Sequence, residues 1–100
     1  VRLTSGQIEM ILEEVTRVLG DEAAVWLYGS RLQDRARGGD VDLMLDVPDQ
    51  PSIRDLAVLR DRLEARLGLP CDLLVRARSE APTAFLQMVA AQAIRLGDAA

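Results

Sequence analysis

The hydrophobic residues near the start of the chain recur at intervals of three and four, which is the spacing of one face of an α-helix. Thr4 and Gln7 have the spacing of a capping box, and Gly20 stands where such a helix would end. The apolar face is made of Ile8, Ile11, Leu12, Val15, Val18 and Leu19. This pattern predicts an amphipathic helix between Thr4 and Gly20.

Two stretches in the next part of the chain have the patterns of β-strands. Residues 24–28 form a short apolar run that predicts a buried strand. Residues 31–39 are polar and end in two glycines, which predicts a loop. Residues 40–47 then alternate, with valine and leucine on one face and aspartates and a methionine on the other. The second stretch therefore predicts a strand that carries carboxylates along one face.

The second half of the chain repeats the helix pattern on either side of a third strand. Ser52 is placed to cap a helix that Gly68 would end. The expected buried stripe of this helix is Ile53, Leu56, Leu59, Leu63 and Leu67, and its expected solvent face carries Arg60, Arg62, Glu64 and Arg66. Residues 71–75 predict a strand, and a last helix is expected after Pro82. The apolar side of that last helix is predicted to be Phe85, Met88, Val89 and Leu96.

The predicted elements follow the order α-β-β-α-β-α over one expected domain, residues 1–100. This order predicts an α+β layered fold in which a small three-strand mixed sheet is backed by helices. A chain of 100 residues supplies enough apolar surface for one hydrophobic core but not for two.

Composition narrows the classes of protein and of site. Charged residues make up 28% of the chain, as in a folded protein rather than a disordered one. The net charge of -4 argues against tight binding to long nucleic acid, which needs a basic face. The absence of histidine excludes histidine-based catalysis, and Cys71, the only cysteine, excludes an internal disulfide and a cysteine metal cluster. Because no internal disulfide can form, a reducing, cytoplasmic setting is expected. No apolar run reaches the roughly 20 residues of a membrane span.

The candidate chemistry lies on carboxylates at strand positions. Asp40 and Asp42 are two residues apart on one strand, so their side chains leave the same face about 7 Å apart. Asp72 begins another strand and would align with them if the two strands are neighbours. Oxygen-only ligands suit Mg²⁺ or Mn²⁺, and three aspartates at one sheet edge are enough to hold two such ions. Two-ion sites of this kind promote in-line displacement at phosphorus.

A second candidate feature precedes the carboxylates. Gly29 and Ser30 follow the first strand, where a glycine lets the backbone approach a ligand and the serine hydroxyl and the next amides can donate to phosphate oxygens. Arg31 is the next residue, and its guanidinium could contact phosphate or form a surface ion pair. Plainer readings exist too: Ser30 could cap a turn, and Asp40 and Asp42 could lie on a solvated strand face.

These residues together resemble the signature of minimal nucleotidyltransferases in the DNA polymerase beta superfamily. The resemblance consists of Gly29-Ser30, a spacer, Asp40-Val41-Asp42, and Asp72 on a later strand, and it extends over nearly the whole chain. It implies a nucleotidyltransferase fold that binds a nucleoside triphosphate, with ATP favoured, and two Mg²⁺ ions.

The resemblance also implies roles for the individual residues. The triphosphate would be bound through the loop at Gly29 and Ser30, with Ser30 in contact with it. Arg31, next to this loop, is kept as a candidate nucleotide-binding residue on its charge alone. Asp40 and Asp42 would ligate metal, and Asp72 would ligate metal and help to activate the attacking hydroxyl. The expected reaction transfers a nucleoside monophosphate, AMP from ATP, to a hydroxyl and releases pyrophosphate.

The acceptor is expected to be a protein. One hundred residues leave little room beyond the triphosphate site, so acceptor recognition calls for a partner or an oligomer. The resemblance implies an antitoxin that adenylylates a helical HEPN-type toxin. The alternative is an inactive binding module that neutralises its partner by masking it. A drug-modifying nucleotidyltransferase is disfavoured because it usually needs a second domain.

Overall fold

The computed structural model describes residues 3–29 and 40–97 of the chain. Its elements are α1 (Ser5–Leu19), β1 (Ala24–Tyr28), β2 (Val41–Val47), α2 (Ile53–Leu67), β3 (Cys71–Ala77), α3 (Ala84–Gln92) and β4 (Ile94–Arg95). The fold is α+β as predicted, with one short strand more than the predicted three. Among the described residues, no helix has both the length and the apolar character to cross a bilayer.

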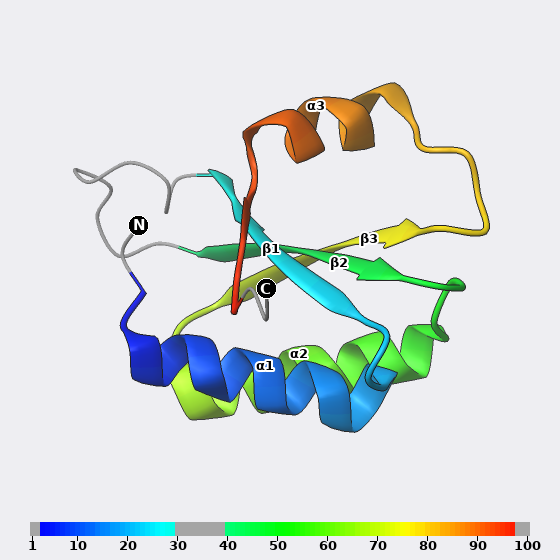
Figure 1. Cartoon of the computed structure of the whole chain (residues 1–100). Coiled ribbons are helices and arrows are strands. Elements are labelled where there is room, and N and C mark those ends of the chain that lie inside the picture. Colours follow the sequence, from blue (N-terminus) through cyan, green and yellow to red (C-terminus); the bar gives the residue numbers. More distant parts are fainter. Residues whose placement is uncertain (1–2, 30–39, 98–100) are drawn as a thin grey trace.

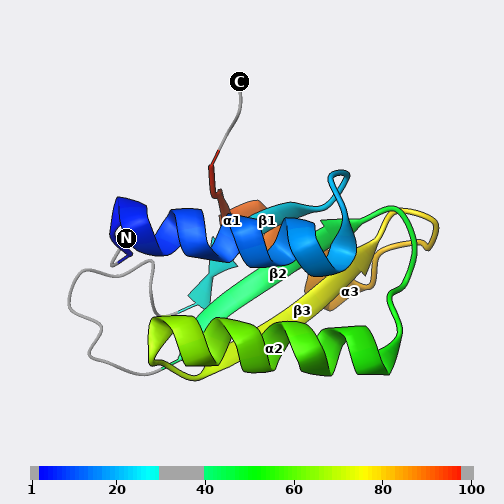
Figure 2. The same cartoon turned by 90° about the horizontal axis from the view of Figure 1, so that it is seen from below.

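The strands form one mixed sheet with helices on both faces. Its order is β3-β2-β1-β4, with β1 antiparallel to both β2 and β4, and β2 parallel to β3. Helices α1 and α2 lie against one face and α3 lies over the other (Figure 1). Seen from below, α1 and α2 lie side by side and run in opposite directions (Figure 2). The parallel pair β2–β3 is joined by α2, as a parallel connection requires a crossover.

The core lies between the sheet and the helix pair. The alternation predicted for residues 40–47 is confirmed, because every second residue of β2 is buried against this core. Met44, predicted on the other face, is also buried. On the side of the helix pair β2 contributes Val41, Leu43, Leu45 and Val47, and α1 and α2 add Ile11, Val15, Leu59 and Leu63. The aspartates of β2 therefore project from the opposite face, on the side of α3.

The helix starts follow the predicted caps. Thr4 and Gln7 form a reciprocal capping box, with hydrogen bonds of 2.9 and 3.0 Å. The Ser52 hydroxyl accepts a 3.0 Å hydrogen bond from the Asp55 amide at the start of α2. These bonds satisfy amide groups that have no partner within the helix itself.

The last helix is shorter than the sequence pattern indicates. It ends at Gln92, and Ala93 adopts an extended conformation that leads into β4. The Leu96 amide then donates a 2.9 Å hydrogen bond to the Val25 carbonyl on β1. Leu96 is buried in the core as predicted, but from an extended segment and not from a helix. The backbone here gains partners along the edge of β1, and that tertiary pairing overrides a helical pattern.

Three residues of the predicted apolar helix faces are exposed. Ile53, the first residue of α2, has 87% of its surface exposed, and Phe85 and Met88 on α3 are both more than half exposed. Among the predicted α3 residues only Val89 is buried within the helix. Apolar residues at helical spacing therefore need not be buried. Ile53 lies at the first turn of α2, and α3 has no second helix beside it on its face of the sheet (Figure 1).

A buried ion-pair cluster joins α1 to α2. Glu14 is almost completely buried, and its carboxylate accepts hydrogen bonds from Arg62 and, at 2.9 Å, from Arg66. Arg66 also bonds the exposed Glu13 at 2.9 Å. The hydrogen bond from Arg62 lowers the pKa of Glu14 although burial raises it, and Arg66 adds to the lowering. Arg62 and Arg66 are exposed on α2, as predicted, and their guanidinium groups also reach the buried Glu14.

Candidate functional site

The pairing of β2 with β3 brings two of the predicted carboxylates together. Asp42 and Asp72 are register partners on these parallel strands, so their backbones lie about 4.8 Å apart and their side chains leave the same face. A 2.8 Å hydrogen bond from the Val41 amide to the Pro70 carbonyl fixes this end of the pair. The predicted alignment of Asp72 with Asp42 required these two strands to be neighbours, and they are.

The third carboxylate contacts the second. Asp40 is exposed, immediately before β2, and its side chain hydrogen-bonds that of Asp72. This bond and the charge of Asp72 raise the pKa of Asp40, and burial and the charge of Glu64 add to the rise. Two carboxylates in such contact repel when both are ionised, so they share a proton or attract a cation. The site thus carries a concentrated negative charge that a metal ion would neutralise.

Gly29 closes the other side of the site. It follows β1 with a φ of 81°, in the left-handed region that favours glycine. A β-carbon placed here would lie 2.9 Å from Cγ of Asp42 and closer still to its Oδ2, well inside van der Waals contact. The backbone at Gly29 can therefore lie against the Asp42 carboxylate only because it has no side chain.

We expect Gly29→Ala to destabilise the protein more than Gly68→Ala does. Both glycines have positive φ, 81° and 71°, so each alanine meets a backbone strain of about 1–2 kcal/mol. A β-carbon at Gly68 has nothing within 4 Å, whereas at Gly29 it meets Asp42 and should cost about 1–3 kcal/mol more. Urea unfolding of both variants measures the difference. Equal losses would contradict the contact between Gly29 and Asp42.

Tyr28 lies at the site, although the sequence motif that contains it gave it no role. It is the register partner of Asp42 on β1, on the same face of the sheet. Partial burial, followed by the charges of Asp42 and Asp72, raises the pKa of the Tyr28 phenol. The phenol therefore stays protonated beside the carboxylates and is available as a hydrogen-bond donor. Its position directly before Gly29 could have indicated that it lies at the site.

The remaining predicted residues divide into two groups. Ser30 and Arg31 lie outside the described residues. Asp46, on the same face of β2, pairs with Arg78 at 2.7 Å, so its role is an ion pair at the far end of the strand. Cys71 is buried as predicted, and burial, then the charges of Glu64, Asp72 and Asp40, raises the pKa of its thiol to about 11.

The side chains at this site have the donor atoms and the charge that a divalent metal needs, but they are not arranged around a common point. Asp40, Asp42 and Asp72 offer only oxygen donors, which Mg²⁺ and Mn²⁺ prefer. Within residues 3–29 and 40–97, however, no three such side chains already surround one point. Asp40 and Asp72 instead contact each other directly. A cation bound by both carboxylates would take the place of that contact. The fit is thus in charge and donor type.

Residues 8–95 match the family model of the nucleotidyltransferase domain. No curated protein is similar in sequence at a significant level.

Several solved structures share the fold. A chain of a toxin–antitoxin structure with AMP-PNP is 22% identical, with a TM-score of 0.69 over 93% of this chain and 72% of that chain. A chain from the Shewanella oneidensis complex of a tri-AMPylated HEPN toxin with MNT antitoxin is 18% identical, with a TM-score of 0.69 over 92% and 71%. A chain of the MntA–HepT toxin–antitoxin complex is also 18% identical, with a TM-score of 0.69 over 92% and 70%.

Proposed function

Because the chain belongs to the nucleotidyltransferase domain family, we propose that it transfers AMP from ATP to a hydroxyl of a HEPN-type toxin and so acts as an antitoxin. The structures that share its fold include a HEPN toxin that is tri-AMPylated and bound to an MNT antitoxin, and a toxin–antitoxin structure with AMP-PNP. The proposal carries the reaction and the partner over from those proteins to this chain.

The observation that carries the proposal is the convergence of Asp40, Asp42 and Asp72 at one end of the β2–β3 pair. Asp40 and Asp42 would hold Mg²⁺ together with Asp72, and the bound metal would neutralise charge on the phosphates. Gly29, Ser30 and Arg31 would hold the triphosphate, as anions are held where backbone amides converge.

In this scheme the chain's own groups orient the acceptor and take its proton. The acceptor oxygen forms a bond to the α-phosphorus while the bond from that phosphorus to the bridging oxygen of the β-phosphate breaks, and pyrophosphate leaves. A carboxylate oxygen of Asp72 would accept the proton of the attacking hydroxyl.

A second candidate function is neutralisation by masking, without catalysis. It is favoured by the uncharged helix α3, on which Phe85 and Met88 are exposed. Exposed apolar side chains of this kind are common in protein interfaces. A masking protein would use this surface and would need none of the three aspartates.

We expect the purified protein, given ATP labelled at the α-phosphate and Mg²⁺, to label a protein in a lysate of its source cell. Mass analysis of the labelled band would identify the acceptor and the modified hydroxyl. If the folded protein labels nothing with any of the four ribonucleoside triphosphates, in Mg²⁺ or in Mn²⁺, the catalytic proposal fails. The masking function would then be the better account.

A further inference from the structure

Strand β3 is an edge of the sheet, and within residues 3–29 and 40–97 nothing hydrogen-bonds the outer backbone groups at its middle. No described strand pairs with its outer side. Both ends are closed, because the Cys71 amide donates to Glu64 at 2.8 Å and the Ala77 carbonyl accepts from the Glu80 amide at 3.0 Å. An edge with free backbone groups between two closed ends is a template for one further strand.

Hydrogen bonds at the two ends of β3 show which backbone groups face outward. The Pro70 carbonyl accepts a hydrogen bond from the Val41 amide, and the Arg78 amide donates one to the Val47 carbonyl. The backbone N–H and C=O groups of even-numbered residues in this segment therefore point toward β2. Backbone groups alternate in direction along a strand. Leu73 and Val75 therefore direct their N–H and C=O groups away from the sheet.

The side chains of β3 are complementary to a second copy of the same strand. We propose that two copies of this chain pair through β3 in antiparallel orientation, with the two-fold axis at Leu74. In this register Leu73 lies opposite Val75 of the second copy, and both residues have outward-facing backbone groups. Such a pair exchanges both of its N–H···O=C bonds. The hydrogen bonds that the edge lacks are thereby supplied.

The same register pairs opposite charges. Asp72 lies opposite Arg76 of the second copy, at a non-hydrogen-bonded position where facing side chains are closest. Registers shifted by one repeat along the strand would place Asp72 opposite Leu74 or Arg78, and Leu74 in turn opposite Asp72 or Arg76. Only the register centred on Leu74 joins the aspartate to the arginine and the apolar residues to each other. Charge complementarity therefore favours a second copy as the occupant.

Arg76 has an incompletely satisfied side chain in the single copy. Its Nε is buried without a hydrogen-bond partner among the described residues. Its side chain lines a small hollow of about 70 Å³ with Pro82 and Leu86 near α3. A carboxylate from the second copy would give the guanidinium an ionised acceptor, the kind that forms its strongest hydrogen bonds.

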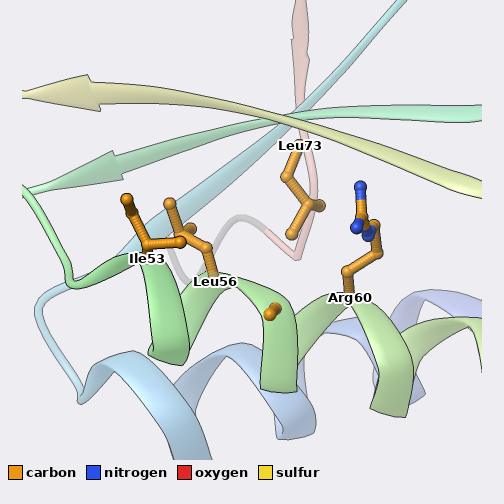
Figure 3. A pocket seen from close by; sticks show the side chains of 5 residues that line it. Ile53, Leu56, Arg60 and Leu73 are labelled. Carbon is orange, nitrogen blue, oxygen red and sulfur yellow. The ribbon is translucent and has the colours of Figure 1, made fainter.

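The helical layer beside the edge is also apolar. A groove of about 250 Å³ lies between α2 and β3, lined by Ile53, Leu56, Ala57, Arg60 and Leu73. Figure 3 shows Leu73 projecting from β3 toward α2, with Leu56 and Ile53 facing it from the helix. Pairing through β3 would bring α2 of each copy toward the axis. The 87% exposed Ile53 would then have apolar neighbours from the second copy.

The dimer would extend one sheet through both copies and would bring Arg76 of each copy to Asp72 of the other. The candidate site of one copy would therefore contain a cation from its neighbour. The edge of β3 would support this dimer whether or not the chain transfers nucleotides.

The first test is sedimentation velocity of the whole chain. We expect wild-type protein to be a dimer and Val75→Pro to raise its dissociation constant at least tenfold, about 1.4 kcal/mol. The Val75 amide faces outward, so proline removes no bond within the copy. Val75→Thr keeps the amide and is the matched control, expected to remain dimeric. Urea unfolding at low protein concentration checks that the monomers are folded.

The second test fixes the register by exchanging charges. Arg76→Asp and Asp72→Arg should each weaken the dimer at least about tenfold, because like charges would then face each other. The double variant restores opposite charges at the same positions and should dimerise again. No other register predicts this rescue, and it remains a test even if the proline variant does not fold.

Three outcomes would overturn the inference. If wild-type protein stays monomeric at about 100 μM, the proposed dimer does not form. A dimer that survives Val75→Pro and both charge reversals would use another surface. A dimer broken by Phe85→Asp and not by the β3 variants would place the interface on α3.

Discussion

Asp42→Asn is expected to lower nucleotidyl transfer roughly 100- to 1,000-fold, because charge stabilisation by correctly held metal ions is worth several kcal/mol in such reactions. Asparagine has nearly the shape of aspartate, so β2 and its pairing with β3 should persist. The measurement is the initial rate of label transfer from α-labelled ATP at saturating Mg²⁺. Circular dichroism and urea unfolding establish that the variant is folded.

Asp46→Asn provides the matched control. Asp46 lies on the same strand and the same face, but it pairs with Arg78 away from the three-aspartate end. The substitution is chemically identical, so a general effect of removing a charge from β2 would appear in both variants. We expect Asp46→Asn to retain most of the transfer rate. Similar rates for the two variants would show that Asp42 has no special part in catalysis.

The same variant separates the two proposed functions. If the protein neutralises its partner by adenylylation, Asp42→Asn should lose neutralisation together with transfer. If it acts by masking, neutralisation should survive the substitution and should be lost with Phe85→Asp on the exposed side of α3. Growth of cells that express the partner alone or with each variant gives the readout.

Arg62→Met with Arg66→Met is expected to cost about 3 kcal/mol of unfolding free energy at neutral pH, near the low end for a buried charge left without its partner. The Glu14 side chain is only 2% exposed, so it cannot regain water when the two guanidinium groups are removed. This loss is a large share of the 5–15 kcal/mol typical of a folded domain. Urea unfolding measures it.

The pH dependence of this loss has a defined sign. In the wild type the pKa of Glu14 is below its ordinary value of 4.5. Its stabilising contribution is therefore complete above pH 4.5 and is lost as pH falls through the lower native value. Without the arginines, burial alone acts and should raise the pKa of Glu14 above that value. The variant should then recover part of its deficit as pH falls from 7 toward 4.5.

Glu14→Leu is the control for this argument. It removes the buried charge and leaves the arginines, whose side chains are 43% and 38% exposed and can be hydrated. Replacing a buried ion by an apolar residue of similar volume is often close to neutral, so we expect a loss below about 1.5 kcal/mol. A loss as large as that of the double arginine variant would mean that the pair itself, and not the stranded carboxylate, sets the cost.

Sequence pattern predicted most of the fold because local and tertiary preferences agree over most of the chain. The strict alternation around Asp42 has one reading as a half-buried strand, and the caps at Thr4 and Ser52 are satisfied by atoms three residues away. The site's strand placement followed from the same alternation. The sequence could not show that β2 and β3 are neighbours, so the alignment of Asp72 with Asp42 was predicted only for the case that they are.

The failures arise where a partner distant in sequence decides. Glu14 is not part of the predicted apolar face of α1, and nothing local shows that Arg62 and Arg66 meet it from α2. The end of α3 was missed because the edge of β1 offers backbone bonds to residues after Ala93. Ile53 continues the period of its helix but lies at its first turn, where the apolar stripe extends past the core.

The separation of the carboxylates along the chain fixes the order in which they appear during protein synthesis. Asp40 and Asp42 leave the ribosome before α2, and Asp72 follows only after that helix. Until then β2 has no parallel neighbour, and Asp40 lacks the carboxyl group with which it shares a hydrogen bond. A growing chain can build helix α1 and pair β1 with β2 while it is still unable to assemble the acidic cluster. Any activity that needs the cluster therefore begins only after β3 has been made and has paired with β2.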